Sequence, residues 1–226
     1  MSKEWADKVE SIFDKVVMPL VRNKRYSELR DRITELLDTE SDPHLRGVLM
    51  NTLASHLHVG GMEEESLLWA KRQVEEFPED PLAWSGLGSW YYYNPLREAT
   101  SQEMNIAKEH YETALEKARA SNEWVCSELY TLCRLLTDMK NYEELEARMR
   151  EILHELTIKR ETDVPQFECD WLKRVPDGKI DSDLVETFWA LEVKDRRRVQ
   201  KLRYDSLPPT LDELNSGKWD ADESSV

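Results

Sequence analysis

Residues 81–91 read PLAWSGLGSWY and residues 107–114 read AKEHYETA, and these two stretches decide the fold. In each stretch, apolar or small residues recur every three or four positions, which is the period of one face of an α-helix. The residues on these faces are Trp84, Leu87, Gly88 and Tyr91 in the first stretch and Ala107, Tyr111 and Ala114 in the second. Because Gly88 and Ala107 are small, we expect two helices to cross closely there, with bulky side chains around the crossing.

The spacing Trp-x-x-Leu-Gly-x-x-Tyr followed by Ala-x-x-x-aromatic-x-x-Ala resembles a tetratricopeptide repeat (TPR), an antiparallel helix pair of about 34 residues. The resemblance implies an all-α fold, a right-handed α-solenoid of about four TPR-like helix pairs. Each end of a solenoid exposes an apolar face, so we also expect a C-terminal capping helix. Acidic residues near the end of the chain predict a tail beyond it.

Three further units fit the same template. The preceding unit lies 34 residues upstream of the central one, an offset that unrelated helices have no reason to share. Its residues are Met50, Leu53, Ala54 and Leu57, then Ser66, Ala70 and Gln73. A degenerate first unit has Phe13, Val16, Val17 and Leu20, then Leu29, Ile33 and Leu36. The fourth unit has Leu129, Leu132, Cys133 and Leu136, then Leu145, Met149 and Ile152.

Turn residues mark the boundaries of the early helices. Pro19 interrupts a first helix over about 3–24, and either kinks it or shortens it. A second helix is predicted over about 26–39, and the next one begins at Ser41-Asp42-Pro43. Gly60-Gly61 predicts the turn that follows it.

The central unit departs from the template between its two helices. About seven more residues separate Tyr91 from Ala107 than the family allows, and they include residues 94–100. The extra residues either lengthen the first helix or form a loop, and Pro95 favours a loop. Loop insertions in repeat proteins are often functional.

The predicted domain organisation has three parts. Residues 1–160 are predicted to form the TPR-like domain, 161–206 a C-terminal capping region, and 207–226 an acidic, flexible tail. The capping helix is predicted over 182–204. Its apolar stripe is Leu184, Phe188, Leu191, Val199 and Leu202, with Ser182 as the expected N-cap.

The composition limits the classes of function. A net charge of −15 disfavours non-specific binding to nucleic acids or anionic membranes and permits a basic partner. No apolar window is long enough to predict a membrane span, and the first residues show no signal core. Cys126, Cys133 and Cys169 lack metal-ligand spacing and are expected to be free thiols, which favours the cytoplasm.

No motif predicts catalysis, a metal or a cofactor. Residues 177–181 (DGKID) are superficially like part of a calcium loop, but the flanking oxygen ligands are absent and a plain turn is expected. His56 and His58 would point to different sides of a helix and cannot share a metal. We therefore expect a protein that is not an enzyme.

If the template holds, the first helix of each pair lines a concave groove. The residues predicted to face this groove are Asn51, Ser55, His58, Ser85, Ser89, Tyr92, Tyr130 and Arg134. Small serines leave room for a peptide backbone, and tyrosines offer flat apolar contact. These eight are called the candidate groove residues below.

The expected function is a cytoplasmic scaffold or adaptor that binds a peptide segment of a partner protein in the groove. Two alternatives stay open. The chain is autoinhibited or self-associating through its tail, where Leu211, Leu214 and Trp219 could dock, or it forms a homo-oligomer. In the other alternative, the basic segment 194–203 binds nucleic acid. This alternative is weaker, because the rest of the chain is acidic.

Overall fold

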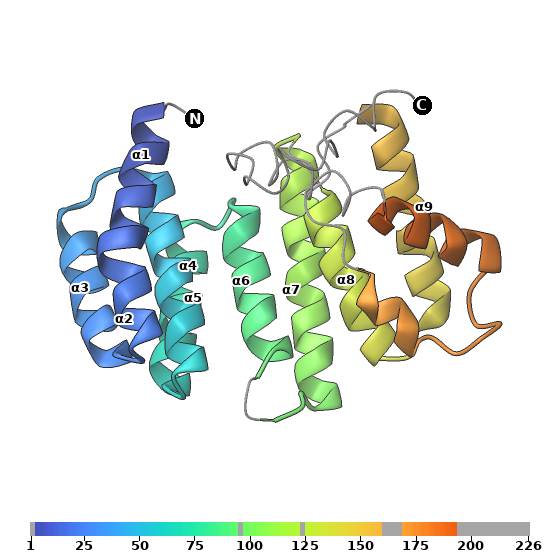
Figure 1. Ribbon diagram of the computed structural model, residues 1–226, viewed down its shortest axis with the longest axis horizontal. Coiled ribbons are helices and arrows are strands. Elements are labelled where there is room, and N and C mark those ends of the chain that lie inside the picture. Colours follow the sequence, from blue (N-terminus) through green and yellow to red (C-terminus); the bar gives the residue numbers. More distant parts are fainter. Residues whose placement is uncertain (1–2, 95–96, 123–124, 160–168, 194–226) are drawn as a thin grey trace, which may run out of the picture. The chain divides into compact units, whose positions relative to one another are not determined.

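The computed structural model describes residues 3–94, 97–122, 125–159 and 169–193, and within these ranges it contains helices and turns but no strand (Figure 1). The chain divides into two compact units, unit 1 up to Glu155 and unit 2 from Leu156 onward. The predicted segments 194–203 and 207–226 lie outside the described residues.

Unit 1 is built from helices joined by short connections. In chain order they are α1 (Lys3–Ile12), the π-helix η1 (Phe13–Val17), α2 (Met18–Arg22), α3 (Tyr26–Thr39), α4 (Pro43–Val59), α5 (Glu63–Glu76), α6 (Pro81–Tyr92), α7 (Ser101–Ala120), α8 (Cys126–Asp138) and the first part of α9 (Tyr142–Lys159). From α1 to α8 consecutive helices pack against each other, and α4 also contacts α6. Figure 1 shows α6 and α7 side by side.

Pro19 distorts the first helix without breaking it. A proline has no N–H and its ring crowds the preceding turn, so an ordinary α-helical turn is disfavoured just before it. The turn before Pro19 widens into η1, and the Met18 N–H bonds to the Phe13 carbonyl five residues back. Helical structure then resumes in α2, which agrees with the kinked-helix alternative.

The predicted start and end of α4 are confirmed. The Asp42 carboxylate accepts hydrogen bonds from the N–H groups of His44 (2.9 Å) and Leu45 (3.2 Å), and thereby caps the helix. At the other end Gly61 has φ +76°, a conformation that glycine adopts without strain.

Of the four predicted pairs of positions 34 residues apart, two are similarly buried, whereas Met50 and Leu57 are buried and their counterparts Trp84 and Tyr91 are half-buried. Leu53 is fully buried and its counterpart Leu87 is 5% exposed, and Ala54 and Gly88 are both buried. On α5 the buried residues are Ser66, Ala70 and Gln73, as the template predicts.

Two of these buried α5 residues are polar, and each finds a partner on α4. The Ser66 hydroxyl donates to the Ala54 carbonyl (2.6 Å), and the Gln73 amide donates to the Gly47 carbonyl (3.1 Å). The Trp90 indole N–H of α6 donates in turn to the Ser66 oxygen (2.9 Å). Buried polar groups that are satisfied in this way fix the register of α4, α5 and α6.

The helix crossing expected at Gly88 is present. A Cβ built on Gly88 would lie 2.9 Å from the Tyr111 ring and 3.2 Å from the Ala107 carbonyl oxygen. Ala107, Tyr111 and Ala114 of α7 are all at most 1% exposed. Only a residue without a side chain allows α6 to approach α7 this closely.

Trp84 does not belong to this core, contrary to the sequence prediction. It is half-buried, and its indole N–H donates to the Pro78 carbonyl (2.8 Å). Its ring lies 5.7 Å from that of His110. The bulk at the crossing is therefore supplied mainly by Tyr111 and Leu87.

The extra residues of the central unit form a loop and lengthen α7, not the first helix. The connection between α6 and α7 covers residues 93–100, of which 95–96 are not described. Thr100 caps α7 through a reciprocal capping box with Glu103. Arg97 donates to the Glu103 carboxylate (2.8 Å), and this contact, together with the Thr100 N–H, lowers the pKa of Glu103 to about 2.

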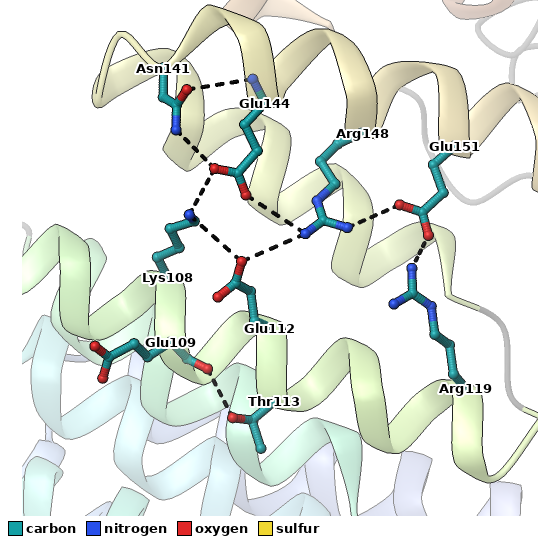
Figure 2. A network of polar contacts seen from close by, with 9 residues as sticks. All are labelled: Lys108, Glu109, Glu112, Thr113, Arg119, Asn141, Glu144, Arg148 and Glu151. Atoms are coloured by element: carbon teal, nitrogen blue, oxygen red, sulfur yellow. Dashed lines mark hydrogen bonds and ion pairs between the residues drawn. The ribbon is translucent and has the colours of Figure 1, made fainter.

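An ion-pair network joins α7 to α9 (Figure 2). Lys108 contacts Glu144 at 2.7 Å, and Arg148 contacts Glu151 at 3.1 Å and Glu112 at 3.6 Å. Arg119 of α7 also pairs with Glu151. Three cations and three carboxylates therefore neutralise one another between the second helices of the last two pairs.

Unit 2 has a small core of its own. Its described elements are the 3₁₀-helix η2 (Asp170–Arg174) and a helix over residues 182–193. The buried apolar residues are Cys169, Trp171, Leu172, Ile180, Leu184 and Phe188, and Glu192 is buried with them.

For this region the sequence predicted a turn at residues 177–181 and a helix capped by Ser182. Gly178 has φ +74° and lies in a turn, as expected. Asp181, not Ser182, caps the helix, because its carboxylate accepts the Asp183 N–H (2.9 Å) and a cap must precede the first helical residue.

Gly88→Ala should lower the free energy of unfolding by about 1–3 kcal/mol, because the buried Tyr111 ring cannot move away from the new methyl group. Gly47→Ala is the matched control, since its Cβ would make only ordinary contact, 3.5 Å from the Asp80 carboxylate. Its effect should be neutral or stabilising by up to about 1 kcal/mol. Urea unfolding followed by circular dichroism measures both, and equal effects would contradict the close crossing.

Arg148→Gln should lower the free energy of unfolding by about 1–2 kcal/mol, because it removes the cation shared by Glu112, Glu144 and Glu151. Arg150→Gln, on the exposed side of the same helix, removes a pair with Glu146 and should change it by less than about 0.5 kcal/mol. Urea unfolding at low and high salt compares the two. A loss for Arg148→Gln no larger than that for Arg150→Gln would show that the network does not stabilise the α7–α9 contact.

Candidate functional site

A cavity of about 380 Å³ opens in unit 1 between α4, α6, α7 and α8. Its lining is mostly aromatic rings and small residues. The lining residues are Ala54, Ser55, His58, Val59, Gly86, Ser89, Trp90, Tyr92, Tyr93, Tyr111, Tyr130, Thr131 and Arg134. The volume lies near the lower end of the range of about 300–1,000 Å³ that is usual for ligand sites.

The helical period explains how these residues meet. Ala54, Ser55 and His58 lie on consecutive turns of α4, as Gly86, Ser89 and Trp90 do on α6. Small side chains at four of the lining positions leave the space, and aromatic rings from α6 and α8 border it.

Six of the eight candidate groove residues line this cavity: Ser55, His58, Ser89, Tyr92, Tyr130 and Arg134. The other two, Asn51 and Ser85, do not. The Asn51 side chain packs against α6, where its oxygen would lie 2.6 Å from a Cβ built on Gly86. Whether the six residues bind a peptide stays a prediction.

The sequence predicted that His58 would be exposed, but in the structure it is buried. It is only 5% exposed, and its Nε2 lies 2.5 Å from the Tyr93 carbonyl oxygen. Since a carbonyl only accepts, Nε2 carries a proton and donates it to this carbonyl. Nδ1 is buried and has no hydrogen-bond partner among the described residues.

The loop after α6 is what covers His58. Tyr93 follows the last residue of α6, and the Asn94 amide donates to the Glu63 carboxylate of α5 (3.0 Å). These contacts hold the start of the loop against the preceding helix pair. The inserted loop thus adds Tyr93 to the wall of the cavity.

The inner wall of the cavity is rigid. The Tyr111 hydroxyl donates to the Ser89 oxygen (3.0 Å), which ties α7 to α6 behind the cavity. Burial raises the pKa of Tyr111 to about 12, so this phenol stays protonated at neutral pH. Tyr92 donates a hydrogen bond from its hydroxyl to Asp138 of α8, which connects the cavity's two aromatic sides.

Arg134 is the only lining residue with a permanent charge. It is exposed, and none of the described residues forms an ion pair with its guanidinium. The net charge of −15 permits a basic partner, but the charged side chain in the described lining is a cation, with the Asp138 carboxylate bonded to the neighbouring Tyr92 hydroxyl.

Sequence reasoning missed several lining residues, of which Trp90 and Tyr93 are the largest. Residues 90–93 read WYYY, and four consecutive aromatic residues cannot all face the core of one helix. This run of four aromatic residues was the sequence signal from which Trp90 and Tyr93 could have been assigned to an exposed site. Tyr111 was assigned to the core, which is correct, but it also forms part of the cavity wall.

A series of aromatic rings runs along the crossing. Neighbouring ring centroids lie 5.3 Å apart for His58 and Trp90, 5.1 Å for Trp90 and Tyr91, and 5.6 Å for Tyr91 and His110. Burial lowers the pKa of His110 below its ordinary value, with Glu109 opposing the effect. The folded chain therefore favours the neutral imidazole.

The described residues show no group of three or more His, Cys, Asp or Glu side chains that could hold a metal ion. Among them no helix has the length and the apolar character that crossing a membrane requires. Cys126, Cys133 and Cys169 are buried free thiols.

Neither the protein-family models nor the curated proteins gave a match to this chain. Among solved structures, the chain is similar to one in a structure of Naa15/Naa10 bound to HypK-THB, at 16% sequence identity and a TM-score of 0.42. The match covers 91% of this chain and 38% of the other. At this TM-score the similarity supports no conclusion about this chain.

His110→Gln should make stability less sensitive to acid. Because the folded-state pKa of His110 is lowered, the unfolded chain binds the proton more readily, and stability falls as pH drops below about 6.5. Urea unfolding at pH 7.5 and pH 5.0 should show a smaller loss for His110→Gln than for the parent. His154→Gln, an exposed histidine of α9, serves as the control and should lose as much as the parent. Equal losses for all three proteins would mean that His110 is not the residue responsible.

Proposed function

We propose that this chain is a protein-interaction scaffold or adaptor that binds a peptide segment of a partner protein in the cavity of unit 1. The observation that carries the proposal is the convergence of six candidate groove residues, from α4, α6 and α8, on one mostly apolar cavity. Aromatic rings bury much apolar area with few rotatable bonds, and this suits them to anchoring a partner segment.

The finer architecture is part of the same proposal. The helices of unit 1 form about four TPR-like pairs in a right-handed solenoid. The 34-residue correspondence between buried positions of α4 and α6 supports this arrangement. First helices of successive pairs then form the walls of the cavity, and second helices are joined at the back by contacts such as the α7–α9 network.

The proposed role is binding without catalysis, in the cytoplasm. Three buried free thiols are in keeping with a reducing compartment. The lining supplies surfaces for contact and one fixed cation rather than a paired acid and base. Tail docking, self-association and nucleic-acid binding remain the alternatives, and the segments they require lie outside the described residues.

Replacing Tyr92 and Tyr130 together by Ala should abolish most partner binding, because it removes two aromatic walls of the cavity. Affinity capture from the native host, with the partners identified by mass spectrometry and quantified, measures the loss. We expect captured partner to fall at least about tenfold, which corresponds to about 1.4 kcal/mol.

The matched control is Leu68→Ala with Leu82→Ala, which removes two exposed apolar side chains that do not line the cavity. Its capture should equal that of the parent. If the tyrosine variant is folded and still captures every partner at the parent level, peptide binding in this cavity is wrong.

A further inference from the structure

The charge of Arg134 in the cavity wall favours peptides that carry an acidic residue. Several other arginines of unit 1 are neutralised: Arg46 pairs with Glu76 at 2.6 Å, and Arg148 with Glu151 at 3.1 Å. Arg134 has no such partner among the described residues, although the chain carries 46 acidic residues. A guanidinium can form two parallel charged hydrogen bonds with a carboxylate, and such bonds are stronger than neutral ones.

The apolar residues of the cavity favour a peptide that also carries a bulky apolar side chain. Val59 and Tyr93 line the cavity and are 49% and 54% exposed, two of the few large apolar side chains this exposed among the described residues. Covering them removes apolar surface from water, which favours a bulky apolar group over a polar one. A lysine or arginine side chain is disfavoured, because it would place a second cation near Arg134.

We propose that the cavity selects a peptide segment in which a bulky apolar side chain lies next to an aspartate or glutamate, with the apolar group between the α6 and α8 tyrosines and the side-chain carboxylate paired with Arg134. The inference rests on the proposed function and names the ligand class of the same site. In this proposal the carboxylate belongs to a side chain within the segment, not to the C-terminus of the partner.

Random seven-residue peptides displayed on phage test the inference, in one library with a free C-terminus and in another with flanking residues on both sides. Selection on the full chain should enrich Phe, Tyr, Trp or Leu beside Asp or Glu in the flanked library. Selection on Arg134→Gln should keep the apolar preference and lose the acidic one. Arg22→Gln is the matched control, since Arg22 is exposed, has no ion pair among the described residues and does not line the cavity.

The best flanked peptide and its Asp→Asn or Glu→Gln version are then titrated against each protein by fluorescence anisotropy. Arg134→Gln should weaken the acidic peptide about tenfold and the amide version hardly at all, which is the coupling expected of a charged hydrogen bond. Arg22→Gln should change neither Kd. Circular dichroism verifies that each variant is folded.

Three outcomes would overturn the inference. They are enrichment of Lys or Arg, equal weakening of the acidic and amide peptides, and enrichment confined to the free C-terminus library. In each of them peptides still bind and the proposed function stands, provided that Tyr92→Ala with Tyr130→Ala abolishes that binding. If neither library yields a binding peptide, the inference and the proposed function fail together.

Discussion

Where α6 crosses α7, the absent side chain of Gly88 leaves room for the Tyr111 ring. The packing of these two helices and one side of the cavity depend on this contact. The ring is buried against α6, and its hydroxyl reaches the Ser89 oxygen one residue further along. Ser89 and Tyr111 are also part of the cavity wall. The same close approach that packs the core therefore makes the inner side of the candidate site rigid.

Hydrogen bonds then fix the neighbouring helices relative to this crossing. Ser66 and Gln73 are buried on α5 and bond to carbonyl groups of α4, while the Trp90 indole of α6 reaches Ser66. A slip of one helix would leave these groups buried without partners, which costs about 1–3 kcal/mol for each. On α7 and α9 an ion-pair network has the same role, although its partial exposure makes it weaker.

The chemistry of the cavity follows from which helices meet there. Tyrosines from α6 and α8 supply apolar surface, small residues of α4 and α6 leave the volume, and α8 contributes one guanidinium. The loop after α6 adds the Tyr93 carbonyl, which accepts the hydrogen bond of His58 Nε2. The cavity therefore offers shape, apolar area and one cationic side chain, and the proposed binding role depends on these features.

Helical periodicity, capping residues and the 34-residue offset were enough to predict the helices, the close crossing at Gly88 and six of the residues around the cavity, because each is a local pattern or a repeat of one. The sequence did not reveal that Trp84 lies half-buried, that Asn51 packs against α6, or that His58 is covered. Those features depend on contacts between residues far apart in the chain: His58 meets Tyr93 across 35 positions, and α8 brings Arg134 to the cavity from beyond α7. Periodicity assigns a side chain to a face of its helix, but only the packed neighbours decide whether that face is open, filled or covered.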